Sequence, residues 1–98
     1  MFEQIDDINL DVEDDDRLVV ETLDKSVLTK GAWSTIVFKF REWDNRKEEM
    51  GATKFTIRRY RKQKGVYRQQ SKFNISSVKQ AKMLIETLQK WVDEEEEG

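Results

Sequence analysis

The stretch "KFTIRRYRKQKGVYRQQSKF", residues 54–73, determines the fold that we predict for this 98-residue chain. Its two halves are rich in aromatic and β-branched residues in alternating order, and they flank the tripeptide QKG at 63–65. Such a pair of runs around a glycine-containing turn is typical of a β-hairpin. The stretch also contains many lysines and arginines and no acid. It therefore predicts two antiparallel strands, near residues 54–62 and 66–75, with a high positive charge.

Two more strands and a helix complete the predicted fold. Residues 17–28 are β-branched and roughly alternating, and residues 33–43, "WSTIVFKFREW", alternate cleanly. Short connections favour antiparallel pairing of these strands. A capping box of Ser77 and Gln80 starts a helix, whose apolar residues recur at spacings of three and four: Val78, Ala81, Leu84, Ile85, Leu88, Trp91 and Val92. We predict an α+β fold, a four-stranded antiparallel curved sheet followed by one C-terminal helix (ββββα).

Charge divides the chain into three segments. Residues 1–24 carry ten acids and one base, residues 25–82 carry sixteen bases and four acids, and residues 83–98 carry one base and six acids. We predict a disordered acidic N-terminal arm at 1–16, one domain at 17–92 and an acidic tail at 93–98. The acidic ends are either solvated segments or mimics of nucleic acid that compete for the basic part.

The composition excludes several classes of function. There is no cysteine and no histidine, which removes disulfides, thiolate chemistry and the commonest general base and metal ligand. We therefore expect no enzyme, no cofactor, no metal and no small-molecule substrate. No apolar run approaches the roughly 18 residues of a membrane span, and the acidic N-terminus is unlike a signal peptide. We expect a cytoplasmic protein that does not bind membranes.

One face of the predicted sheet is the candidate site. We expect the helix to cover the face made of Ile36, Phe38, Phe40, Phe55, Ile57, Phe73 and Ile75. The opposite face is then open, and it carries the residues that we predict to bind nucleic acid: Lys39, Arg41, Trp43, Arg58, Tyr60, Lys62, Arg68 and Lys72, with Gln70 among them. Like charges on paired strands are destabilising. Phosphates would relieve that repulsion, and the two rings could stack on unpaired bases.

Other interpretations stay open for these residues. Exposed charges on a sheet also serve solubility and prevent aggregation, and Arg59, Arg61 and Lys64 fit that role as well as binding. Trp43 either stacks on bases or closes the end of the sheet. Tyr67 and Trp91 are interpreted as core or interface residues. A second hypothesis is a protein-interaction module, in which the basic face docks an acidic partner and the N-terminal arm recruits another through Phe2, Ile5 and Leu10.

The element order and the segments "STIVFKFREW" and "KFTIRRYRKQKGVYRQQSKFNISSVKQAKMLIETLQKWV" resemble the purine-rich-element-binding (PUR) domains and the related coactivator positive cofactor 4. The likeness covers residues 17–92. It implies a PUR/Whirly-like fold, a homodimer with helices packed between protomers, and single-stranded nucleic acid bound on the curved sheets. By position, the residues that match the family's contacts are Lys39, Arg41, Arg58, Tyr60, Arg68 and Lys72.

The chain departs from the family in two places. The loop "DNRKEEMGATK" at 44–54 is long, and the N-terminal arm is acidic where the coactivator has a serine- and lysine-rich leader. Together, the residues and the resemblance predict a protein that binds single-stranded DNA or RNA and regulates transcription.

Overall fold

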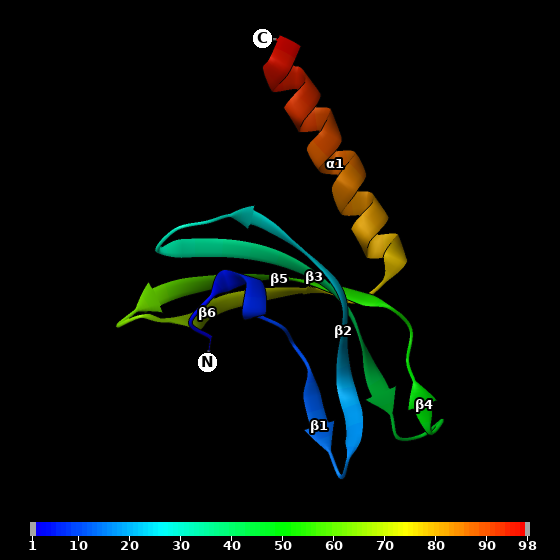
Figure 1. The fold of residues 1–98 in the computed structure, drawn as a ribbon. Helices are drawn as coiled ribbons and strands as arrows, with labels where there is room; N and C mark the ends of the chain where they lie inside the picture. The colour runs from blue at the N-terminus through cyan, green and yellow to red at the C-terminus, as the bar shows by residue number, and fades with distance from the viewer. Residues whose placement is uncertain (1, 98) are drawn as a thin grey trace.

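The computed structural model describes residues 2–97, which form one curved antiparallel sheet and a C-terminal helix (Figure 1). The elements are η1 (Ile5–Asp7), β1 (Val12–Asp14), β2 (Arg17–Thr29), β3 (Trp33–Asp44), β4 (Glu49–Met50), β5 (Lys54–Gln63), β6 (Val66–Ile75) and α1 (Val78–Glu97). The strand order is β1-β2-β3-β5-β6, and β4 pairs with β3. The predicted α+β class, the antiparallel sheet and the single C-terminal helix are confirmed. The predicted four strands correspond to β2, β3, β5 and β6, and two short strands, β1 and β4, are added to them.

Two tight turns close the hairpins at opposite ends of the sheet. Asp15 and Asp16 join β1 to β2 with φ angles of 51° and 62°. Lys64 and Gly65 join β5 to β6 with φ angles of 53° and 83°. Two central residues with positive φ give the turn whose twist matches that of the flanking strands. The β5–β6 turn confirms the hairpin that residues 54–73 predict.

The register between β3 and β5 decides which side chains share a face. Phe38 lies opposite Thr56, and Ile36 lies opposite Arg58. Directly opposed residues of antiparallel strands point to the same side of the sheet. We call the side that carries Ser34, Ile36, Phe38 and Phe40 the arm face, and the side that carries Thr35, Val37, Lys39, Phe55 and Ile57 the free face.

The N-terminal arm, described from residue 2 to residue 16, covers the arm face. Ile8 is fully buried and Leu10 is 7% exposed, and both belong to one core with Ile36 and Phe38. Acidic composition predicts a disordered arm, but Ile8 and Leu10, two of the apolar residues spaced through it, are buried against the sheet. Figure 1 shows the arm on the concave side of the sheet and α1 projecting from the other side. The prediction that α1 covers Ile36, Phe38 and Phe40 is therefore wrong.

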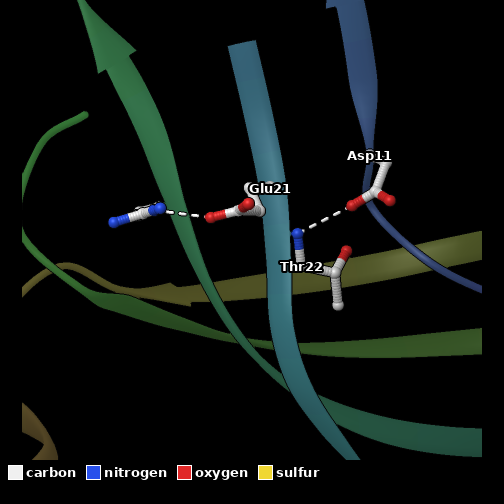
Figure 2. Close-up of polar contacts among 4 residues, drawn as sticks. Asp11, Glu21 and Thr22 are labelled. Atoms are coloured by element: carbon white, nitrogen blue, oxygen red, sulfur yellow. Dashed lines mark hydrogen bonds and ion pairs between the residues drawn. The ribbon is translucent and has the colours of Figure 1, made fainter. Parts of the chain in front are cut away.

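Polar contacts fasten the arm to β2. The Leu10 backbone N–H donates to Thr22 Oγ1 at 2.8 Å, and the Thr22 backbone N–H donates to Asp11 Oδ1 at 2.7 Å (Figure 2). The Lys25 ammonium donates to three arm carbonyls, those of Ile5 at 3.3 Å, Asp6 at 2.6 Å and Ile8 at 2.8 Å. These bonds satisfy backbone groups that burial would otherwise leave unpaired.

Helix α1 begins where the capping residues predict. The Gln80 backbone N–H donates to Ser77 Oγ at 3.1 Å, and Gln80 Oε1 accepts from the Ser76 backbone N–H at 3.0 Å. None of its described residues is buried, since it contacts mainly β6 and projects away from the sheet (Figure 1). Large apolar side chains therefore stay exposed on it: Val78, Met83, Ile85, Leu88, Trp91 and Val92. The predicted acidic tail continues this helix as far as Glu97. Within residues 2–97 no helix is long and apolar enough to cross a membrane.

Candidate nucleic-acid interface

The predicted site residues do not share one face. Strand alternation and register place Lys39, Arg41, Trp43 and Arg68 on the free face, and Arg58, Tyr60, Lys62 and Lys72 on the arm face. The prediction of a single open face is wrong for two reasons. β5 pairs with β3 one residue away from the assumed register, and such a slip moves every side chain of a strand to the other side. A bulge between β5 and β6, where Gln70 is left without a partner, then places Arg68 and Lys72 on different faces. Both faces of β5 and β6 carry apolar residues, so hydrophobic pattern alone fits either register.

Tyr60 lies in the core, where its ring cannot stack on a ligand from solvent. It is 4% exposed, opposite Ser34 and within the cluster that includes Ile36 and Tyr67. Burial raises the pKa of the Tyr60 phenol above its usual value, and the nearby charge of Arg58 acts in the opposite direction. The phenol is therefore uncharged at neutral pH.

Two of the candidates on the free face are engaged within the chain. Arg41 Nε lies 2.6 Å from Glu21 Oε1, and this ion pair is drawn in Figure 2. The guanidinium of Arg17 lies over the Trp43 ring, 4.2 Å from its centroid. Trp43 thus packs against Arg17, the first residue of β2, at the end of the sheet.

The three candidate lysines are exposed cations. Lys39 lies opposite Asp24 on β2, and Lys72 lies opposite Arg58 on β5. The Lys62 ammonium lies 5.4 Å from the centroid of the Tyr67 ring. Among residues 2–97 none of these three lysines has a carboxylate within ion-pair distance, so their charges remain available to a polyanion.

The structure brings together a group that the sequence analysis did not recognise as a site. Trp33 is 42% exposed, and the guanidinium groups of Arg59 and Arg61 lie over its ring, 4.7 Å and 5.3 Å from the centroid. Arg61 lies opposite both Trp33 on β3 and Arg68 on β6. We call Trp33, Arg59, Arg61 and Arg68 the basic-aromatic cluster. All four residues lie on the free face, which the N-terminal arm leaves uncovered.

A signal for this cluster was present in the sequence. The alternation that places Lys39 and Arg41 on one face of β3 also places Trp33 there. Arg59 and Arg61 join them only through the β3–β5 register, which places Arg59 opposite Thr35 and Arg61 opposite Trp33. The sequence alone shows the alternation along β3, but it does not show how β5 pairs with β3.

Charge is unevenly distributed between the two ends of the sheet. The basic-aromatic cluster lies at the end that holds the β5–β6 turn with Lys64. The opposite end holds the β1–β2 turn, where Asp14, Asp15 and Asp16 follow one another. A polyanion is therefore attracted to one end of the molecule and repelled by the other.

Comparison of this chain with protein-family models, curated proteins and solved structures gave no match. The resemblance to PUR domains therefore stays a prediction, and the candidate site is argued from its own geometry.

Proposed function

We propose that this chain binds single-stranded nucleic acid, DNA or RNA, through the basic-aromatic cluster. The observation that carries the proposal is the position of Trp33, a partly exposed ring close to the guanidinium groups of Arg59 and Arg61 on an uncovered sheet face. Exposed rings among cations are the means by which proteins hold unpaired bases and their phosphates, at roughly 1–3 kcal/mol for each stacked base. Bases in a duplex are already stacked, which favours single strands.

Repulsion within the cluster supports the same function. Arg61 and Arg68 are directly opposed on neighbouring strands, and like charges in that position are destabilising. Among residues 2–97 neither arginine forms an ion pair with a carboxylate. A bound phosphate would neutralise both and release counterions. Lys39 is a further cation of the same face and lies beyond Val37 along β3. Regulation of transcription is a role that such binding would serve.

The alternative, a protein-interaction module whose N-terminal arm recruits a partner, has less support. Its hypothesis requires Phe2, Ile5 and Leu10 to be free for a partner. Leu10 is buried, and Phe2 and Ile5 pack against the chain's own core.

We also propose that the chain forms a homodimer through α1. The helix exposes a row of large apolar side chains that includes Ile85 at 65% and Leu88 at 49%. The free face carries a second apolar strip, Val37, Phe55, Ile57 and Phe73. A two-fold dimer requires a self-complementary surface, and these two apolar surfaces of one chain could pack against those of a second copy.

The experiment is a fluorescence-anisotropy titration of labelled single-stranded and duplex oligonucleotides at several salt concentrations. We expect preference for the single strand and a log–log salt dependence of about −0.7 for each neutralised phosphate. The paired substitution Arg59→Glu with Arg61→Glu should weaken binding about 100-fold, since each lost charge-assisted contact is worth roughly 1.5 kcal/mol.

The matched control is Arg46→Glu with Lys47→Glu, which makes the same change in net charge in the exposed turn after β3. It should leave affinity within about threefold, through the weak long-range effect of net charge. An equal loss in both variants would show that overall charge, and not the cluster, governs binding. Absence of binding at low salt would refute the proposed function.

A further inference from the structure

A cleft on the arm face carries a second inference. It lies between the N-terminal arm and the β5–β6 hairpin, has a volume of about 330 Å³, and is lined by Phe2, Asn9, Arg58, Tyr60, Tyr67 and Gln69, with Arg68 at its edge. The arm builds one wall, and the Tyr67 backbone N–H donates to the Phe2 carbonyl at 2.7 Å where the wall meets β6. The cleft therefore exists only because the arm packs on the sheet.

Arg58 supplies a positive charge that the chain itself leaves uncompensated. Its Nη1 donates to Gln69 Oε1 at 2.8 Å, and its Nε is buried without a hydrogen-bond partner in the described residues. No carboxylate of residues 2–97 forms an ion pair with it, although the neighbouring arm is acidic. A partly buried charge without a counterion costs stability. An anion bound in the cleft would offset that cost.

The other walls suit a flat ring with polar edges. Phe2, which is only partly buried, presents aromatic surface, whereas Tyr60 and Tyr67 are almost fully buried behind the lining. The amides of Asn9 and Gln69 offer both donors and acceptors. Tyr60 keeps its proton at neutral pH because burial raises its pKa. Aromatic surface, amides and a cation together match a nucleobase and its phosphate better than they match a simple inorganic anion.

The cleft and the basic-aromatic cluster adjoin the same edge of the sheet. β6 is the edge strand, and Arg68 belongs to both sites, since it lies opposite Arg61 and also lines the cleft. We infer that a single strand held on the free face passes over the β6 edge and places one unpaired nucleotide in this cleft, with its phosphate against Arg58. This inference rests on the proposed function and extends it to a nucleotide-binding pocket on the opposite face.

The test uses photo-crosslinking of the full chain with an oligonucleotide that carries 5-iodouracil, followed by mass spectrometry of the peptides. We expect adducts on Tyr67 or Phe2 as well as on Trp33. Arg58→Gln should weaken binding about tenfold and reduce the salt slope by about 0.7, one phosphate contact. The control Arg46→Gln removes the same charge from the β3–β4 turn and should change neither quantity.

The experiment distinguishes a failure of the cleft inference from a failure of the proposed function. Tight binding with adducts on Trp33 alone would overturn the cleft and leave the proposed function intact. An unchanged salt slope for Arg58→Gln would likewise overturn the inference, even if the affinity falls, because a purely structural defect removes no phosphate contact. If Arg58→Gln unfolds, the crosslinks of the unsubstituted chain still decide. Absence of any oligonucleotide binding would refute the proposed function itself.

Discussion

Phe38 of β3 lies directly opposite Thr56 of β5, and this pairing places Arg58 and Arg59 on opposite sides of the sheet. Arg58 faces the N-terminal arm, and Arg59 lies over Trp33 on the free face. Neighbouring arginines of β5 therefore lie in two different environments. The first lies beside a half-enclosed cleft, and the second is an open surface with an aromatic ring.

The N-terminal arm should contribute to stability. Ile8→Ala should lower the free energy of unfolding by about 3 kcal/mol, because the side chain is fully buried against Ile36 and Phe38. Urea denaturation measures this loss. Val12→Ala, which removes methyl groups from a half-exposed position of β1, is the control and should cost less than about 0.5 kcal/mol. Equal stability of both variants would mean that the arm does not pack on the sheet in solution.

The two tryptophans at opposite ends of β3 should differ in their effect on binding. Trp33→Ala should weaken the single-strand complex by roughly 1–3 kcal/mol through loss of a stacking surface. Trp43→Ala should change affinity by less than about 0.5 kcal/mol, because Trp43 lies at the opposite end of β3 from the basic-aromatic cluster. Anisotropy titrations of both variants at one salt concentration make the comparison. A larger loss for Trp43 would move the site to the other end of the sheet.

The exposed helix residues should hold the proposed dimer together. Ile85→Asp and Leu88→Asp place charges on a side of α1 that is exposed in the single chain, so they should leave the protomer folded and convert a dimer to a monomer. Light scattering coupled to size exclusion measures the mass, and circular dichroism checks the fold. Lys90→Asp, a charge reversal elsewhere on α1, should leave the dimer intact. A monomeric unsubstituted chain would contradict the proposal.

Stability should depend on pH above the usual phenol pKa. Burial raises the pKa of Tyr60 above about 10. Below that pH the phenol is protonated in both folded and unfolded chains, so the group adds no pH dependence. Above it the unfolded chain loses the proton while the folded chain retains it, so unfolding becomes easier as pH rises. Urea denaturation at about pH 8 and about pH 11 should show a smaller decline for Tyr60→Phe than for the unsubstituted chain. Identical declines would contradict this assignment.

The sequence predicts the elements well because their signals are local. The turn residues between β5 and β6, the alternation of β3 and the Ser77 cap each act within a few positions. The partition of the site between two faces depends instead on the β3–β5 register and on the bulge between β5 and β6. A long connection that contains the short strand β4 separates β3 from β5 in the sequence. A shift of β5 by one residue would place Phe55 instead of Thr56 opposite Phe38, and the sheet would still have an apolar face. The hydrophobic pattern of the sequence therefore does not distinguish the two registers.

The packing of the N-terminal arm on the sheet could not be predicted from the local sequence either. Ile8 and Leu10 lie among acidic residues, and the overall acidic composition of the arm predicts disorder in spite of them. Their burial depends on a concave sheet face that exists only after distant strands have paired. The same dependence hides the cleft beside Arg58, since its two walls come from opposite parts of the chain.

The attachment of Lys25 has a consequence for how this protein can change over evolution. Its ammonium binds the carbonyls of Ile5, Asp6 and Ile8, and among residues 2–97 it forms no ion pair with a carboxylate. Carbonyls are the same whatever side chain a residue carries, so this anchor tolerates substitution of the acids beside it. Asp6 and Asp7 can therefore change without loss of this anchor, whereas Asp11, whose carboxylate accepts from the Thr22 backbone N–H, is part of the attachment itself.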